Sequence, residues 1–532
     1  MTAGTVTSSG VRAGHDGFGQ LLRAEWIKFR TVRGWVIGLV VAALVTVGVG
    51  LLAHDSCSNG NGTACSLPLG PGGEAVADSF YFVRQPLAGN GSITVRVTSL
   101  TGQIPTGSST GRVRADAGSG PGAGARAGAS MRSGLEPWSK AGIILAASTR
   151  QGAAYAAMMV TGTHGVRMQY NYTGDTPGLA GAVSTASPRW LRLTRSGETV
   201  TGYDSADGLS WTRVGTVRLA GLPSTVQAGL FAASPLYTKI VSQSLGGSSG
   251  TGSPTLASGT FDRVALGGNW PDGRWTGADI GGADAMYPQD PGAFHQAGDR
   301  IIVTGSGDIA PDVPGSGGGV NISQTLVGTF AGLIAVVVVA TMFITAEYRR
   351  GLIRVTLAAS PRRSRVLAAK AIVTGLVVFA TGLVAAAIAL PLGEQALRKG
   401  GSFIDPVSTL TELRLVAGTA ALFAVAAVLA LAIGTMLRHS AVAVTAVIVV
   451  IVAPYILGTV LPAGATQWLL RVTPAAGFAI QGAYPRYSQI TASYSAAGGY
   501  YPLMPWAGLA VLCAWTAVAL GLAAYLLRRR DA

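Results

Sequence analysis

Six apolar stretches, each about 20 residues long, constrain this chain more than any other feature. They cover residues 34–53, 326–346, 371–392, 415–436, 441–461 and 505–527, and none contains Asp, Glu, Lys or Arg. At a rise of about 1.5 Å per residue, a helix of this length crosses the roughly 30 Å hydrocarbon layer of a bilayer. The sequence therefore predicts an all-α membrane domain of six transmembrane helices.

The first stretch is open to a second interpretation, because basic residues precede it and a secretory signal begins in the same way. The core of a signal is usually about 7–15 residues long and ends in a small-x-small site. The apolar run at 34–53 is longer and is followed by His54 and Asp55. We therefore favour an uncleaved anchor, with a signal peptide as the alternative.

The formal net charge of +15 is unevenly distributed. Lys and Arg are concentrated in the tail 1–33, in the segment 347–370 and after residue 527, whereas acidic and basic residues nearly balance in 54–325. Because the loops of membrane proteins that stay in the cytoplasm are rich in Lys and Arg, we expect a protein of the plasma membrane with both termini and 347–370 in the cytoplasm and 54–325 outside. This topology explains the basic character without a nucleic-acid partner.

The predicted outside region reads as short strands, such as TVRV at 94–97, AGIILAAS at 141–148 and WLRLTR at 190–195. Many short strands separated by Gly, Ser, Asp and Pro are typical of an antiparallel β-sandwich. Residues 102–134 have few large apolar side chains, so we predict a flexible insertion there. The region therefore predicts an all-β domain between the first and second transmembrane helices.

Cysteine and histidine offer little chemistry in this chain. Cys57 and Cys65 lie in the predicted outside region and are expected to form a disulfide in an oxidising compartment. Cys513 lies in the last apolar stretch, where it is interpreted as a packing residue. His164 and His295 have no partners at metal-ligand spacing, so no metal site is predicted.

The segment before the first stretch has helical amphipathicity. On a helix over 18–33, Phe18, Leu21, Leu22, Trp26 and Phe29 share one face, and basic residues lie opposite. This pattern is typical of a helix that lies in the membrane interface. Glu25 interrupts the apolar face, and a plain basic flank that only sets orientation is the alternative.

The sequence lacks the residues by which transport proteins commonly use an ion gradient or hydrolyse ATP themselves. Ion-coupled carriers normally place ionisable residues inside the bilayer, and the six stretches have none. The chain also has no Gly-Lys dipeptide, so it lacks the GxxxxGK[ST] loop that cradles nucleotide phosphates. We therefore expect no enzyme activity and no cofactor, and a pump built on this chain needs its ATPase in another subunit.

Three features together resemble a known family. They are the segment LLRAEWIKFRTVRGW at 21–35, the long gap after the first stretch, and the run FITAEYRRGLIRVTLAASPRRSRVLAAKA at 343–371. With six predicted spans, they resemble permeases of ATP-binding-cassette transporters, type-2 exporter class, and in particular actinobacterial members with an inserted ectodomain. The resemblance implies an exporter that contains a separate ABC ATPase subunit and a second permease subunit, identical or different.

In that class, a coupling helix between the second and third spans docks on the ATPase. By position, the resemblance assigns this role to Glu347, Arg349, Arg350, Gly351, Arg354, Pro361, Arg362, Arg363 and Arg365. Alternatively, the arginines only fix orientation and bind membrane lipid with anionic headgroups. The resemblance also implies that the outside loop 462–504 lies along the outer membrane surface as a re-entrant exit segment.

The predicted outside domain has a resemblance of its own. The runs WSKAGI at 138–143, YDSADGLSW at 203–211 and GTFDRVAL at 259–266 resemble a concanavalin-like β-sandwich, a fold that includes sugar-binding modules and glycosidases. The domain has no pair of acids spaced by two on a strand, which argues against a glycosidase. Trp138, Trp190 and Trp211 are either core residues, the favoured interpretation, or a surface for sugar stacking.

Two functions therefore stay open. The first is the permease of an ATP-driven exporter. The second is a membrane-anchored protein that binds glycan or cell wall, or senses it, and does not transport. Five further spans are superfluous for display, where one anchor is enough, and this favours transport.

Overall fold

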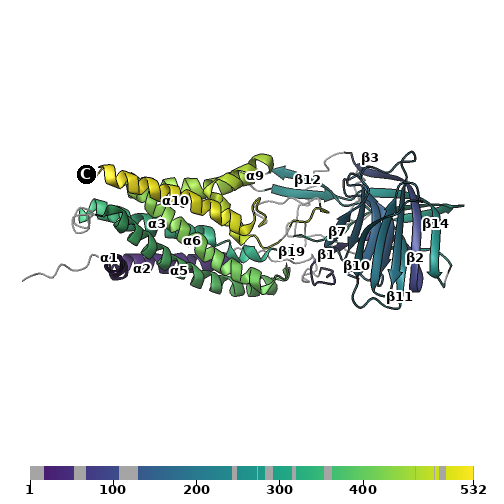
Figure 1. Ribbon diagram of the computed structural model, residues 1–532, viewed down its shortest axis with the longest axis horizontal. Helices are drawn as coiled ribbons and strands as arrows, with labels where there is room; N and C mark the ends of the chain where they lie inside the picture. The colour runs from purple at the N-terminus through teal and green to yellow at the C-terminus, as the bar shows by residue number, and fades with distance from the viewer. Residues whose placement is uncertain are drawn as a thin grey trace, which may run out of the picture.

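The computed structural model joins a bundle of helices to a β-rich domain at one end of the bundle (Figure 1). Helix α1 and the C-terminus lie at the opposite end, which we call the distal end. The structure describes residues 17–52, 67–106, 130–242, 248–271, 273–281, 291–313, 319–352, 362–461, 463–484, 486–490 and 499–530. The predicted disulfide between Cys57 and Cys65 lies outside these residues.

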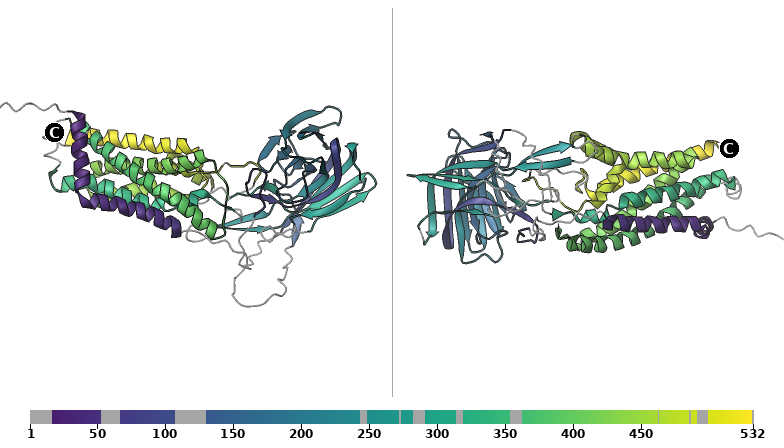
Figure 2. Two further views of the ribbon diagram at one scale, coloured as in Figure 1. Left: turned by 90° about the horizontal axis from the view of Figure 1, so that it is seen from below. Right: turned by 180° about the vertical axis from the view of Figure 1, so that it is seen from behind.

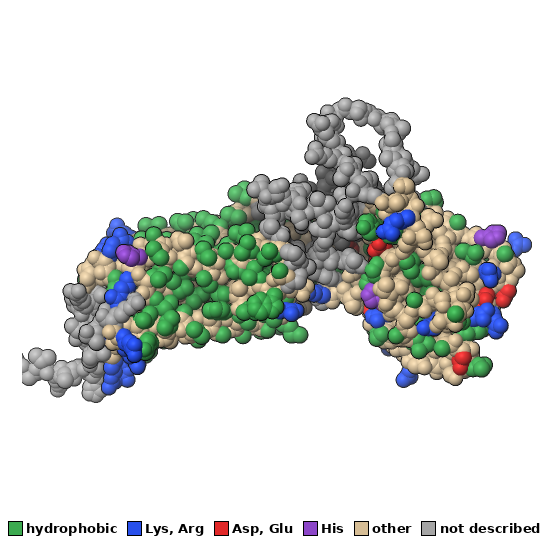
Figure 3. Space-filling view, turned by 90° about the horizontal axis from the view of Figure 1, so that it is seen from above, with side chains coloured by type: hydrophobic (Ala, Val, Ile, Leu, Met, Phe, Trp, Pro, Cys, Tyr) green, Lys and Arg blue, Asp and Glu red, His purple; other side chains and the backbone are tan. Residues whose placement is uncertain are grey.

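Among the described residues, 6 helical segments are long and apolar enough to cross a membrane. The helices are α1 (Phe18–Thr31), α2 (Arg33–Leu52), α3 (Thr329–Arg349), α5 (Arg363–Lys399), α6 (Thr409–Leu437), α7 (Ser440–Ile451), α8 (Ala453–Val460), α9 (Ala463–Val472) and α10 (Pro505–Arg530), with short 3₁₀ turns η1 (Ile322–Leu326) and η2 (Pro474–Gln481). Hydrophobic side chains cover the side of the bundle, and Lys and Arg gather at its distal end (Figure 3).

Two helices differ from simple spans over the apolar stretches. Helix α5 has 37 residues, extends beyond 371–392 at both ends, and continues through Pro391 to Lys399. The fifth apolar stretch is divided at Val452 into α7 and α8. Pro454 explains this break, because proline has no N–H to donate to the preceding turn.

Helix α3 packs closely against α2. A Cβ atom on Gly328 would lie 1.9 Å from the backbone oxygen of Thr46, and one on Gly332 would lie 1.9 Å from Thr46 Oγ1. Small residues at such crossings let the backbones of membrane helices approach and gain van der Waals contact. On its other sides α3 contacts α6 and α7, so it runs through the interior of the bundle.

The β-rich domain is organised around one long strand, β2 (Phe80–Pro105). Its first part pairs with β11 and β15, and its later part pairs with β8, β14 and β3, so one strand belongs to both parts of a bent 14-stranded sheet (Figure 2). The other strands of this sheet are β3 (Met131–Ser133), β4 (Lys140–Ala146), β5 (Tyr155–Thr161), β6 (Val166–Tyr170), β7 (Gly174–Pro177), β8 (Arg189–Ser196), β9 (Thr199–Ser205), β10 (Thr212–Arg218), β11 (Thr225–Ala233), β14 (Leu256–Asn269), β15 (Thr276–Ile280), β16 (Ala293–Ala297) and β17 (Arg300–Gly305). Three separate pairs are β1 (Val76–Asp78) with β18 (Ile309–Pro311), β12 (Tyr237–Ser242) with β13 (Ser248–Ser253), and β19 (Gly319–Val320) with β20 (Phe403–Ile404), which lies between α5 and α6.

The centre of the sheet is buried on both faces. All seven residues of β4 are buried. Ile143 and Leu145 pack into one apolar cluster, whereas Ile144 and Ala146 pack into another. Because side chains alternate across a strand, the two clusters lie on opposite faces of the sheet, which explains the continuous apolar run at 141–148.

The predicted flexible insertion at 102–134 includes, at both of its ends, residues that belong to the sheet. Residues Gln103, Ile104 and Pro105 of β2 pair with Ser133, Arg132 and Met131 of β3. Backbone pairing makes these residues part of the sheet, and Ile104 among them is buried. Residues 107–129, the centre of the predicted insertion, lie outside the described part of the chain.

Candidate functional site

Four charged side chains from three helices meet at the distal end of the bundle, and we call them the ion cluster: Glu25, Lys28, Glu347 and Lys370. Lys370 Nζ on α5 lies 2.6 Å from Glu25 Oε2 on α1 and 2.7 Å from Glu347 Oε1 at the end of α3. Lys28 Nζ lies 2.9 Å from Glu25 Oε1 and 3.4 Å from Glu347 Oε1. The ion cluster therefore joins the N-terminal helix to the two helices that flank 350–362.

The path of α1 brings these charges together. Helix α1 lies across the distal end at a steep angle to α2 (Figure 2), and its buried residues are Glu25 and Phe29. The Phe29 ring packs edge-on against Phe343 at 5.3 Å, and the Lys370 ammonium lies 4.8 Å from the centre of the Phe343 ring. The acid that interrupts the apolar face of α1 is therefore the one that faces the bundle and binds the buried lysine.

Burial makes the cluster sensitive to any change in charge. Lys370 is 1% exposed and Glu25 is 2% exposed. Two carboxylates and two ammonium groups balance, which meets the condition under which charges are tolerated away from water. Each buried charge depends on the others, because removal of one partner leaves a charge without compensation.

The structure divides the nine residues that the sequence assigned to ATPase coupling. Arg354 and Pro361 lie outside the described residues. Glu347 is buried in the ion cluster. Arg363 Nη1 donates to the backbone oxygen of Leu527 at 2.9 Å, so this side chain caps the end of α10.

The remaining assigned residues are exposed at the distal end: Arg349, Arg350, Gly351, Arg362 and Arg365. Gly351 has a φ of 69°, and its N–H bonds to the carbonyl of Tyr348, so it ends α3 in a left-handed conformation that glycine adopts without strain. Four arginines therefore remain on the surface on either side of 353–361, available to a partner.

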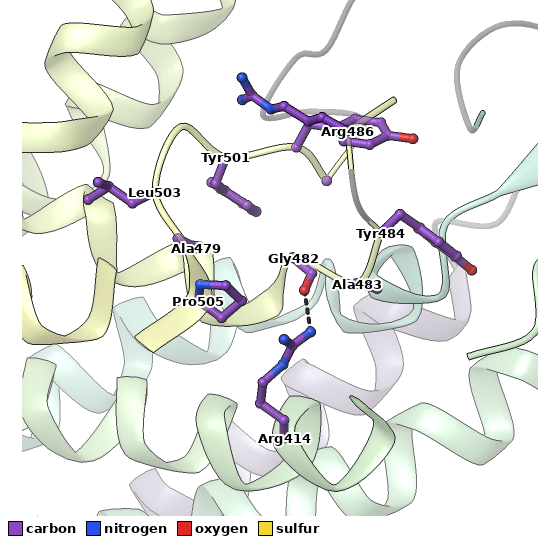
Figure 4. Close-up of a pocket in the computed structure, with 11 residues that line it drawn as sticks. Arg414, Ala479, Gly482, Ala483, Tyr484, Arg486, Tyr501, Leu503 and Pro505 are labelled. Atoms are coloured by element: carbon purple, nitrogen blue, oxygen red, sulfur yellow. Dashed lines mark hydrogen bonds between the residues drawn. The ribbon is translucent and has the colours of Figure 1, made fainter. Parts of the chain in front are cut away.

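A second polar site lies at the other end of the bundle, beneath the β-rich domain. A cavity of about 220 Å³ is lined by residues of α6, η2 and the segments next to α10 (Figure 4). Arg414 enters it from α6 and donates through Nη2 to the carbonyl of Gly482 (Figure 4). All eight residues of η2 are buried. This part of the loop 462–504 is thus inserted between helices.

The β-rich domain contacts the bundle through hydrogen bonds. Asp405, between α5 and α6, accepts from the backbone N–H of Ala75 at 3.1 Å, and Gln489 donates to the carbonyl of Tyr172 at 3.0 Å. Burial raises the pKa of Asp405 to about 6, although the bond from Ala75 opposes this rise. Asp312 and Glu74 lie near enough to raise the pKa further by repulsion.

A buried carboxyl also supports this face of the β-rich domain. Asp78 accepts from the Tyr172 hydroxyl at 2.7 Å and from the N–H of Gly152 at 2.8 Å. Burial raises the pKa of Asp78 to about 6, against the opposing effect of these two donors. The carbonyl of Tyr172 also accepts the bond from Gln489. Tyr172 therefore connects Asp78 to the contact between the β-rich domain and the bundle.

The three tryptophans of the β-rich domain have different environments. Trp138 is 3% exposed and stacks on His164 at 3.9 Å. Trp190 and Trp211 are half-buried, and the Arg192 guanidinium lies 3.8 Å from the centre of the Trp211 ring. Core packing was the favoured interpretation for all three, and this degree of burial fits Trp138 alone. In the part of the chain that the structure describes, no group of three or more His, Cys, Asp or Glu is arranged to hold a metal.

Sequence reasoning missed the ion cluster. Lys370 is the last charged residue before the third apolar stretch, and it was treated as part of a basic cytoplasmic segment. Two residues in unusual positions could have indicated it: Glu25 lies on the apolar face of α1, and Lys370 lies next to a long apolar run. Two such residues compensate each other only when the helices meet.

Comparison with known proteins identifies the family. The family model described as ABC-2 family transporter protein matches residues 184–532, which is more than half of the chain. No curated protein matches the chain significantly.

Solved structures show only weak likeness. A functionally unknown protein from Saccharomyces cerevisiae is 16% identical over 40% of this chain and 86% of its own, with a TM-score of 0.23. Scytalido-glutamic peptidase with a transition state analog inhibitor is 8% identical over 43% of this chain and 98% of its own, also at 0.23. The GH43 protein BlXynB mutant from Bacillus licheniformis is 13% identical over 40% of this chain and 27% of its own, at 0.16. Such low scores support no conclusion about this chain.

Proposed function

Because the chain belongs to the ABC-2 transporter family, we propose that it is the permease of an ATP-driven exporter and that the distal end receives the force of its ATPase. Members of this family are membrane transport components, so the chain is a multi-pass membrane protein that works with an ABC ATPase subunit. Family membership also argues against the alternative of a display or sensing protein that does not transport.

The ion cluster carries the proposal about coupling. Glu347 is the last buried residue of α3 before the exposed arginines. Its salt bridge to Lys370, together with the bridge from Lys370 to Glu25, connects it to α5 and α1. A push on 350–362 therefore acts on three helices through short, buried contacts. Such connected polar contacts are a physical route by which a local displacement becomes a movement of helices.

The exposed arginines at the distal end supply the docking surface in this proposal. Arg349, Arg350, Arg362 and Arg365 flank 353–361 and suit an acidic cleft on the ATPase. The distal end then lies in the cytoplasm and the β-rich domain outside the plasma membrane, as the distribution of Lys and Arg favours. This orientation places the cavity beside Arg414 at the outer mouth, where exported cargo leaves.

A second permease subunit, identical or different, completes the pathway. We further propose that the β-rich domain is a concanavalin-like ectodomain of the kind found in actinobacterial members, on the sequence runs described above. Its position over the end of the bundle (Figure 1) suits a cover for the outer mouth.

Co-purification tests the coupling surface. The chain is expressed with its ABC ATPase subunit, and the ATPase recovered is measured for the wild type, Arg350→Glu and Arg362→Glu. Reversal of an interface charge usually weakens association strongly, so we expect each variant to lose most of the ATPase. Arg528→Glu is the matched control, since Arg528 is an exposed cation at the same end on α10. Equal recovery for all four proteins would exclude docking at this surface.

A further inference from the structure

A groove between α2 and α3 opens at the distal end, next to the ion cluster. It has a volume of about 600 Å³. Its deeper lining is apolar and comes from Trp35, Val338, Val339, Met342 and Phe343. Its rim is polar and comes from Lys28, Glu347, Arg349 and Arg350. The groove thus combines a charged mouth with an apolar interior.

Glu347 lines the groove and belongs to the ion cluster. Glu347 is 8% exposed, and its Oε1 receives both lysines of the ion cluster. Its Oε2 is buried and has no hydrogen-bond partner among the described residues. The ion cluster therefore holds the Glu347 carboxylate, and Oε2 is too buried for a ligand in the groove to reach.

The charges of the mouth favour an anion. Within the ion cluster, Lys28 and Lys370 are balanced by Glu25 and Glu347. Arg349 and Arg350 are exposed and add two positive charges that the cluster does not neutralise. Arginine binds phosphate oxygens in a fork geometry. An occupant therefore carries an anionic group of the phosphate type.

The depth of the groove fits a hydrocarbon chain. Val339 and Glu347 are eight residues apart on α3, so the apolar lining extends about 12 Å from the charged rim. Val32 is 42% exposed and Met342 is 36% exposed at the edges of the groove, so it opens to the side of the bundle that hydrophobic side chains cover. Apolar surface at this depth faces acyl chains rather than water.

We propose that this groove is a binding site for one anionic phospholipid, for which phosphatidylglycerol serves as the probe. Its phosphate binds Arg349 and Arg350, and one acyl chain lies along Val338, Val339 and Met342. The site does not depend on the presence of an ATPase.

Two glycines of α2 provide a matched test. Gly34 lines the groove, and a Cβ atom on it meets nothing within 4 Å, so Gly34→Leu adds a side chain to the groove from a position that is open at Cβ. Gly48 is equally open, but it is not among the residues that line the groove, so Gly48→Leu is the control. The purified chain is titrated with phosphatidylglycerol and phosphatidylcholine, and bound lipid is counted by native mass spectrometry.

We expect the wild type and Gly48→Leu to retain one phosphatidylglycerol in preference to phosphatidylcholine, and Gly34→Leu to lose this preference. Arg349→Gln with Arg350→Gln is expected to weaken phosphatidylglycerol binding about fivefold per arginine, and Arg528→Gln not at all. Equal binding of both lipids by the wild type, or unchanged binding by Gly34→Leu, would overturn the proposal. Because the ATPase is absent from this assay, failure of coupling leaves the result unaffected.

Discussion

Replacement of Lys370 by methionine is the sharpest perturbation of the distal end. Lys370 is 1% exposed and is shared by Glu25 and Glu347 at 2.6 and 2.7 Å. Methionine fills similar space but removes the charge, and both carboxylates then stay buried without their shared partner. We expect Lys370→Met to lower the free energy of unfolding by about 3–5 kcal/mol, the range for one partner removed from a buried ion pair.

Lys28→Met is the comparison for this expected loss in the free energy of unfolding. The Lys28 ammonium contacts the same two acids, but its side chain is 41% exposed, so water replaces much of what a mutation removes. Exposed ion pairs contribute about 1 kcal/mol or less. Lys28→Met is therefore expected to cost at most about a fifth to a third as much as Lys370→Met.

The assay is denaturation of the full chain in mixed micelles, with the free energy of unfolding measured for each variant. A triple variant, Lys370→Met with Glu25→Gln and Glu347→Gln, removes the uncompensated charges and is expected to regain most of the stability lost by Lys370→Met. Equal costs for the two lysine variants, or a triple variant no more stable than Lys370→Met, would refute the assignment of Lys370 as the centre of a buried cluster.

Three further predictions concern the contact between the β-rich domain and the bundle, and the packing of α3 against α2. The pKa of Asp405 is raised to about 6, so between about pH 4 and 6 the native state binds a proton that the unfolded state has released. The free energy of unfolding should therefore fall by up to about 3 kcal/mol as pH rises through this range, as measured by melting curves. Asp405→Asn should reduce that slope, and an unchanged slope would contradict the assignment. Tyr172→Phe removes a 2.7 Å donor to Asp78 and should cost about 1–3 kcal/mol, more at pH 7 than at pH 5, where the carboxyl is protonated. Gly328→Ala places a Cβ 1.9 Å from a backbone oxygen and should destabilise the chain by at least about 1–3 kcal/mol in the same micelle assay, whereas Gly521→Ala, which meets nothing within 4 Å, should be neutral.

The sequence predicted those features that depend on local pattern. Long apolar runs without charge predicted the membrane helices, and alternation between turn residues predicted a β-rich domain before α3. The amphipathic segment predicted α1. Each of these signals lies within one element, so no knowledge of its neighbours was needed.

Contacts between distant elements were beyond the reach of sequence reasoning. Glu347 and Lys370 are 23 residues apart, and Glu25 and Lys370 are 345 apart. Only the turn of α1 across the bundle brings these charges within reach. The role assigned by position to Glu347 therefore changes from a surface contact to an internal link, while Arg350 and Arg362 remain on the surface.

ATP hydrolysis by the partner subunit tests the central claim most directly. The partner ATPase is measured with the chain in lipid nanodiscs, as wild type, Arg350→Glu or Lys370→Met, at a temperature at which each variant stays folded. If the distal end couples the two subunits, wild type changes the hydrolysis rate, Arg350→Glu loses this effect by failing to bind, and Lys370→Met binds but loses the effect. Hydrolysis that responds equally to all three proteins would contradict the account.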